Sequence, residues 1–524
     1  MGHVRARGDF LMDIRKLCIG AAVAAAALPY GAADAHYFSS SDTGVDALDY
    51  IEDRHREERE NFLYDDETRL IKDTEDMRKK LRHPELLKDP TSQVPTSFEG
   101  DDMSWDQSTG DFTAKGHVRI TTLDKRRFEA DEATGNTIEQ RVEVPGRTHL
   151  LQMTDGMTRV RLDGYKANYS YSTKKGSIDD ASGKAGHYYV TGKRFEFYPD
   201  HVVVYDGTAT KCAAKRPDYQ MRAKKIEVYP DQKIIMTDVE FWLGKAMMMK
   251  RHHYENDIGA STKDRELIYP RVGWDDDDGV WIRQSLRYNI AKNVKLTPVY
   301  LYGTKIHTKS SAILQWQSGG SRLHVDYGFY DDSDDHWIKK KPSLIWEYGA
   351  HFGVMPLSWR LKTEYGQWDD GDIDSTHTYG GVNVYHDPII LGKDCRLFLG
   401  VGYEVTHESY DHSRVKGFSY DISTVKEFSP VFAMYTGYHF TKNSENRTLF
   451  NYDVDDFERK LETGCSLRLT HLDRIVAGTE YDLDRDSLRD VDYYWYHDVH
   501  CAQFVVRYRA KRDSWHVSFN FIPW

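Results

Sequence analysis

The sequence predicts an all-β protein that has a periplasmic β-jelly-roll in front of a transmembrane antiparallel β-barrel. Apolar and polar residues alternate from Gly279 to Trp524, as in Leu323, Val325 and Tyr327, which are separated by His324 and Asp326. Side chains of a strand change face at every residue, so each segment has one apolar and one polar face. A soluble sandwich shows the same period. Charged residues on the inward faces, aromatic residues on the outward faces and segments of about ten residues favour a membrane barrel.

The N-terminus, 1–35, has the pattern of a cleavable export signal. Arg15 and Lys16 precede the apolar stretch Leu17–Leu28, and Ala33-Asp34-Ala35 is a small-x-small cleavage site. The apolar stretch is too short for a transmembrane anchor. Export agrees with a barrel that is assembled in an outer membrane.

Residues 36–94 are highly charged and have few apolar positions and no clean heptad. This composition predicts a solvated helix or a partly ordered linker, and a coiled-coil arm is the alternative. Pro84, Pro90 and Pro95 end the segment.

Residues 95–255 contain short strands with an internal repeat. Arg194-Phe195-Glu196 and Lys225-Ile226-Glu227 each open a strand that runs into a Pro-Asp turn, at Pro199-Asp200 and Pro230-Asp231. Repeated strand–turn–strand units predict stacked V-shaped strands in a solenoid-like or jelly-roll domain. If the inner faces are not fully packed, they form an apolar trough, and otherwise the same residues make an ordinary core. The candidates for the trough are Phe195, Phe197, Val202, Val204, Ile226, Val228 and Met236.

The barrel is expected within 265–524. The alternation predicts about fourteen strands, and an even number keeps both ends of the barrel on the periplasmic side. The predicted strands are 280–290, 294–303, 307–316, 321–330, 344–353, 356–366, 376–386, 395–406, 415–424, 429–440, 460–470, 473–482, 499–510 and 514–522.

Composition excludes several classes of function. The net charge of −12 argues against nucleic acid as a partner. The segment after the signal holds Cys212, Cys395, Cys465 and Cys501, none of them in a CxxC motif, so neither a metal site nor thioredoxin chemistry is supported. An oxidising periplasm makes disulfides the expectation, and four cysteines allow three pairings. No cofactor is expected.

Two segments carry a resemblance to a known family. The first runs from Gly207 through Cys212 and Pro217 to Trp242, and the second from Tyr269 through Pro298 to Tyr300. In order and spacing they resemble the LPS-assembly protein LptD (organic solvent tolerance, OstA) family. The resemblance covers roughly 98–310 and returns near Cys501.

The resemblance implies transport of lipopolysaccharide. In the family, lipid passes along a jelly-roll similar to the bridge protein LptA and leaves between the first and last barrel strands. Here this lateral seam would involve Ser285, Pro298, Phe519 and Phe521, because proline donates no ladder hydrogen bond. Family members often carry a second proline where this chain has Ser285.

The resemblance also implies a disulfide and several partners. Cys212 and Cys501 match the positions of an inter-domain bridge, whereas Cys395 and Cys465 either pair or stay reduced. The implied partners are lipopolysaccharide, an LptA-like periplasmic bridge protein, the barrel assembly machinery and outer-membrane lipids. Whether an LptE-like lipoprotein fills so small a barrel stays open.

Two other functions fit an outer-membrane barrel. A diffusion porin would not need the repeated strands in front of it. A lipid-modifying enzyme would need a catalytic constellation, and His324 with Asp326, or His351 with Glu347, share a strand face. Because histidine and acidic residues are common inside water-filled barrels, we expect no enzyme and name no catalytic residue. His252 and His253 are adjacent on a strand and point to opposite faces, which argues against a metal site.

Overall fold

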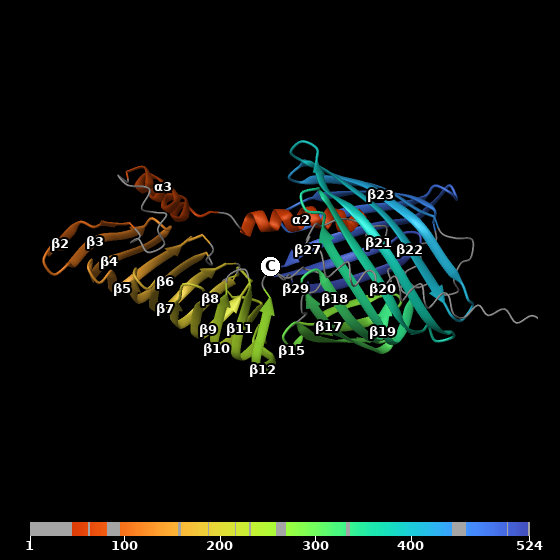
Figure 1. The fold of residues 1–524 in the computed structure, drawn as a ribbon, viewed down its shortest axis with the longest axis horizontal. Helices are drawn as coiled ribbons and strands as arrows, with labels where there is room; N and C mark the ends of the chain where they lie inside the picture. The colour runs from red at the N-terminus through yellow and green to blue at the C-terminus, as the bar shows by residue number, and fades with distance from the viewer. Residues whose placement is uncertain are drawn as a thin grey trace, which may run out of the picture. The chain divides into compact units, whose positions relative to one another are not determined.

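The computed structural model describes residues 44–60, 63–80, 95–155, 159–186, 188–214, 216–229, 232–257, 269–331, 336–442, 457–499 and 501–521. The predicted signal at 1–35 and the turn residues Pro230 and Asp231 lie outside these ranges. Two compact units make up the chain (Figure 1). The barrel unit contains residues up to Glu52, Pro270–His497 and Phe504–Asn520, and the sheet unit contains Asp53–Tyr269, Asp498–Gln503 and the residues from Phe521.

The charged segment 36–94 contains two helices, α2 (Gly44–Glu60) and α3 (Asp65–Lys80). Acidic residues begin α3 and Arg78, Lys79 and Lys80 end it, which complements the helix dipole. None of the described helices is long and apolar enough to cross a bilayer. Helices are therefore present where the sequence allowed either a solvated helix or a linker, and the first half of α2 belongs to the barrel unit.

The sheet unit is a single antiparallel sheet whose strands pair almost entirely in chain order. Its strands are β1 (Thr96–Glu99), β2 (Asp102–Trp105), β3 (Asp111–Thr122), β4 (Arg126–Asn136), β5 (Arg141–Gln152), β6 (Val160–Ser170), β7 (Lys175–Ala185), β8 (Tyr188–Phe197), β9 (Val202–Thr210), β10 (Tyr219–Tyr229), β11 (Lys233–Leu243) and β12 (Ala246–Asp257). Both β1 and β2 pair with β3. The described strands pair as a meander, and the Greek-key crossover of a jelly-roll is not shown among them.

Many strands of the sheet bend near their middle. Non-glycine residues adopt left-handed φ values at His117 (45°), Lys166 (52°), Asp180 (44°), Asp206 (45°) and Asp238 (51°). Such residues accompany β-bulges, and the pairing shifts register beside several of them. Side chains from both halves of the strands, such as Phe112 and Ile120 of β3, contribute to one core. The stacked, bent strands thus enclose a continuous apolar interior from β3 to β12.

The second unit is a closed antiparallel barrel of sixteen strands, which corrects the predicted fourteen. Its segments are β13 (Arg271–Asp275), β14 (Gly279–Ser285), β15 (Tyr288–Ala291), β16 (Val294–Gly303), β17 (His307–Ser318), β18 (Ser321–Asp331), β19 (Trp337–His351), β20 (Leu357–Asp369), β21 (Asp374–Ile390), β22 (Cys395–Glu408), β23 (Arg414–Ser429), β24 (Phe432–Lys442), β25 (Arg459–Arg468), β26 (Asp473–Asp482), β27 (Ser487–Val499), β28 (Ala502–Arg509) and β29 (Ser514–Phe521). Both β14 and β15 pair with β16, so together they occupy one strand position. The two strands that the prediction missed are β13 and β27.

The barrel is apolar outside and polar inside. Exposed large apolar side chains recur on neighbouring strands, among them Trp316, Leu323, Tyr327, Leu344, Tyr365, Tyr403, Ile422, Leu467, Ile475 and Trp495. The residues that alternate with them are buried and often charged, among them Asp326, Lys340, Glu364, His377, Glu408, His439, Glu462, Arg474 and Asp482. This distribution is the reverse of a soluble barrel and is typical of one that faces lipid.

Candidate functional site

The interior of the folded sheet is filled by its own side chains. All seven trough candidates lie in the sheet core and are less than a tenth exposed: Phe195, Phe197, Val202, Val204, Ile226, Val228 and Met236. Register pairs Phe195 with Val204, and Val204 with Ile226, so these candidates form rows across β8, β9 and β10. The structure therefore brings the candidates together as predicted, but as a packed core instead of an open trough.

A groove of about 710 Å³ lies on the sheet unit. It is lined by Glu143, Asn168, Ser177 and Glu196, which are successive cross-strand partners on β5 to β8. These residues alternate with core residues, so the groove lies on the outer face of the sheet.

The charges of this groove are largely paired. Arg194 Nε donates to Glu196 Oε1 at 3.0 Å, and the Tyr198 hydroxyl donates to Glu196 Oε2 at 3.0 Å. Burial raises the pKa of Glu196, but the hydrogen bonds from Tyr198 and Arg194 outweigh this effect and hold that pKa below its usual range. The groove is of mixed character, because Val144, Ala167, Tyr169 and Phe197 line it beside these polar residues.

Helix α3 is attached to the sheet by ion pairs that each have one buried partner. Glu67, whose side chain is 2% exposed, accepts a hydrogen bond from Arg159 Nε at 2.7 Å. Asp73 pairs with the buried Arg127 at 2.6 Å. The sheet is basic and the helix acidic along this contact, and the fully buried Leu70 lies on the same helix.

The barrel closes through a short seam between β13 and β29. The register covers only Val272–Asp275 against His516–Phe519, whereas β20 and β21 pair from Leu357 to Asp369. Beside the ladder, His516 Nδ1 lies 3.4 Å from the Asp275 carboxylate, and Asp276 accepts a hydrogen bond from the Trp515 amide at 2.7 Å. The closing ladder therefore has fewer backbone hydrogen bonds than the long β20–β21 junction.

The position of the seam corrects the prediction that placed its first strand near Val280. The alternation missed β13 because five residues are too short to show a period. The predicted residue Phe519 does lie at the seam, paired with Val272. Ser285 instead ends β14 and pairs with Val299 of β16, away from the closing ladder.

Pro298 lies opposite a break in the barrel ladder. It belongs to β16, the third strand position instead of the second, and pairs with Ala312 of β17. On its other side, β14 ends at Ser285 and β15 begins at Tyr288, and the Leu286 amide donates to the Pro298 carbonyl at 3.1 Å. Because proline has no amide hydrogen to return this bond, the ladder is interrupted here.

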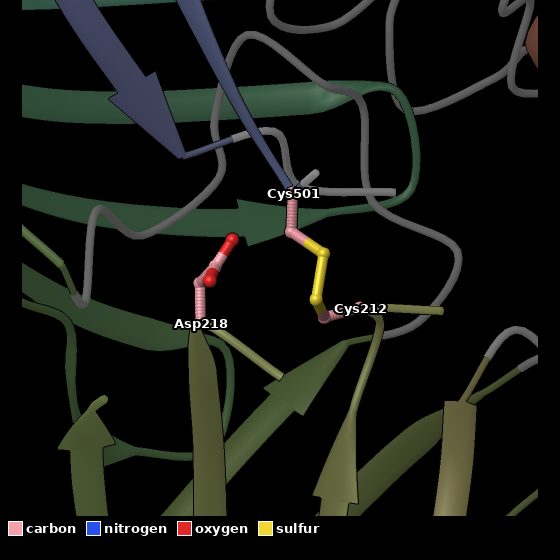
Figure 2. Close-up of side chains that lie close together, drawn as sticks. All are labelled: Cys212, Asp218 and Cys501. Carbon is pink, nitrogen blue, oxygen red and sulfur yellow. A yellow bond between two sulfur atoms is a disulfide. The ribbon is translucent and has the colours of Figure 1, made fainter. Parts of the chain in front are cut away.

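Cys212 and Cys501 form a disulfide, the bond that the family resemblance implies (Figure 2). Cys212 follows β9, and Cys501 lies in the turn between β27 and β28, which belongs to the sheet unit. Tyr219, Tyr269 and Phe521 pack beside the disulfide. Phe521, predicted at the seam, is therefore part of this cluster.

Asp218 lies beside the disulfide (Figure 2). With Cys212 and Cys501 it forms a group of three potential metal ligands. Its carboxylate and the two sulfur atoms lie within 4.8 Å of one another. A metal site would require both sulfurs as thiolates, and the disulfide removes them. Cys395 and Cys465, the other described cysteines, are both free.

Of the two pairs considered for catalysis, His324 contacts Asp326, whereas His351 and Glu347 have other partners. His324 Nδ1 lies 2.7 Å from Asp326, whose other oxygen lies 3.9 Å from Lys340 Nζ. His351 pairs with Asp387 at 3.1 Å instead of Glu347, which pairs with Arg322 at 3.6 Å. Neither histidine is combined with a nucleophile in these contacts.

No protein-family model and no curated protein matches the sequence. Among solved structures, a bacterial polysaccharide outer membrane secretin aligns with 13% identity and a TM-score of 0.31, covering 48% of this chain and 97% of that chain. Engineered mutants of the Rh. blastica porin align with 9% identity and a TM-score of 0.28, with the same coverage. Similarities this low do not indicate a function.

Proposed function

We propose that the protein is an outer-membrane translocon that receives lipopolysaccharide on the folded sheet and releases it through the β13–β29 seam. One observation carries the proposal: a sheet with a continuous apolar interior and a barrel with a short closing ladder occur in one chain. The apolar outer surface of the barrel supports the membrane location. The sheet unit would lie in the periplasm.

Transport along the sheet requires its two halves to separate around acyl chains. Most side chains of the interior are apolar, so acyl chains can replace many of the contacts between the halves. Arg126, which lies over the Tyr169 ring, and Thr148 are buried polar exceptions. The proposed role is transport and involves no catalysis.

The edge at β1 and β2 is where an LptA-like bridge protein would dock. Each of these strands pairs with β3, and no other described strand pairs with them. An exposed strand edge can extend into the sheet of a partner by backbone hydrogen bonding. This arrangement would continue the apolar interior from one protein to the next.

Photo-crosslinking to lipid tests the path. A photoreactive amino acid at Phe197 or Val228, both in the interior, should crosslink to lipopolysaccharide in cells. The matched control is Lys193, a surface residue of β8 that pairs with Asp206. Crosslinks at Lys193 alone, or at none of the three sites, would contradict the proposal.

A disulfide lock tests the seam. In a Cys395→Ser/Cys465→Ser background, Val272→Cys with Phe519→Cys joins register partners across the seam. The control pair, Val382→Cys with Tyr403→Cys, joins register partners on β21 and β22. Oxidation should stop surface delivery of lipopolysaccharide only for the seam pair.

The same measurements separate the alternatives. A porin would keep delivering lipopolysaccharide when locked, and its depletion would change solute uptake alone. A lipid-modifying enzyme would leave surface lipopolysaccharide present with altered acyl chains.

A further inference from the structure

The first half of α2 lies inside the barrel. Val45, Ala47, Leu48 and Ile51 are buried and share one apolar cluster with the barrel wall. The wall residues come from β22 to β28: Phe398, Val425, Ala433, Tyr435, Val476, Tyr496 and Val505. Val476 is fully buried and its neighbour Ile475 is exposed on the outer surface, so the cluster faces the lumen.

The helix packs against two glycines of the barrel wall. Gly464 of β25 and Gly478 of β26 are register partners. A Cβ atom at Gly464 would lie 3.5 Å from Leu48 Cδ1, and one at Gly478 would lie 3.5 Å from Val45 Cγ2. The missing side chains let the helix pack closely on the wall, and a side chain larger than alanine would contact the helix directly.

Two ion pairs orient the helix. The Arg474 guanidinium pairs with Asp49, and the Tyr496 hydroxyl donates to the same carboxylate at 3.3 Å. Arg468 pairs with Glu52. All four charged side chains are needed for this arrangement, since an unpaired charge in the lumen wall would be costly.

These contacts lie near one end of the barrel. Arg468 and Arg474 flank the turn 469–472 between β25 and β26. Strands alternate in direction, so this turn lies at the same end as the β27–β28 turn that carries Cys501. If the sheet unit is periplasmic, as proposed above, this is the periplasmic end.

We propose that Gly44–Glu52 is an intrinsic plug that closes the lumen to solutes and occupies the place of a separate plug protein. The proposal is independent of lipopolysaccharide transport, because it concerns the permeability of the lumen alone.

Conductance of the full-length protein in planar bilayers tests the plug. Leu48→Asp places a charge in the apolar cluster and should displace the helix, which raises single-channel conductance severalfold. Lys79→Asn, at an exposed position on α3 outside the plug, should leave the conductance unchanged. Equal conductance of Leu48→Asp and wild type would overturn the proposal.

A reversible lock covers the case in which Leu48→Asp fails to fold. Val45→Cys with Gly478→Cys, in the Cys395→Ser/Cys465→Ser background, should form a disulfide that mass spectrometry detects as a linked peptide. Asp46→Cys with Gly478→Cys is the control and should not form one. The locked barrel should keep the low wild-type conductance. Two free thiols after oxidation, or a locked barrel that conducts like an open pore, would show that the helix does not close the lumen.

Discussion

Cys212 and Cys501 are separated by 289 positions in the chain, yet their Cα atoms lie 5.3 Å apart and their sulfur atoms are bonded. The disulfide ties the end of β9 to the turn between β27 and β28. Both cysteines belong to the sheet unit, so the disulfide joins two distant parts of the chain within that unit.

Loss of this disulfide should destabilise the protein. For a loop of this length, the entropy of the unfolded chain gives an upper bound of about 6 kcal/mol for the cost of Cys501→Ser. The measurement is the temperature at which the barrel loses its folded migration in gel electrophoresis, together with protease resistance of the sheet unit. Cys395→Ser is the control, and an equal effect of the two substitutions would contradict this prediction.

Removal of Arg159 should release α3 from the sheet. Arg159→Ala leaves the buried Glu67 carboxylate without its guanidinium, which costs about 3–5 kcal/mol. Amide hydrogen exchange in α3 should accelerate by roughly a hundredfold or more. Lys79→Ala removes an exposed pair with Asp76 and should change the exchange by less than about fivefold.

Docking of α3 should weaken in acid. Burial raises the pKa of Asp66, but its hydrogen bond and charge interaction with Arg161 outweigh this and hold the pKa below its usual range. A carboxyl whose pKa is depressed by docking stabilises the docked state above the undocked pKa of about 4. This contribution is lost as the pH falls through the lower pKa of the docked state.

A fluorophore on Lys79→Cys, in the Cys395→Ser/Cys465→Ser background, reports the docking of α3 through its anisotropy. Asp66→Asn should remove part of the acid transition, whereas Asp76→Asn should preserve it. An identical acid transition in the protein and in Asp66→Asn would rule out Asp66 as its source.

Pro298→Ala should strengthen the barrel wall. Alanine supplies the missing amide hydrogen, so the break between β14 and β15 can close by a ladder bond worth about 1 kcal/mol. We expect a higher temperature of barrel unfolding and, under the proposed function, slower delivery of lipopolysaccharide. Thr297→Ala, beside it in β16, is the control. A lower unfolding temperature for Pro298→Ala would mean that the proline supports the wall.

The sequence by itself determined that the chain is all-β and ends in a barrel. The reason is that alternation is local: each residue of a strand shows by its polarity which face it occupies. The internal repeat likewise predicted the stacked, bent strands around Phe195 and Ile226, because turn chemistry and strand period are both short-range. The pairing of Cys212 with Cys501 came from a family resemblance, since spacing alone left three pairings open.

Only the tertiary structure decided the strand count, the seam and the contents of the two interiors. Closure needs a partner for the last strand, and β13 fills this position although it is too short to show a period. Whether Phe197 and Val228 make a trough or a core depends on how closely the sheet halves approach, which no single strand encodes. The charged sequence of α2 did not predict that its first half lies in the lumen. This position depends on contacts with Gly464, Gly478 and Arg474, which are distant in the chain.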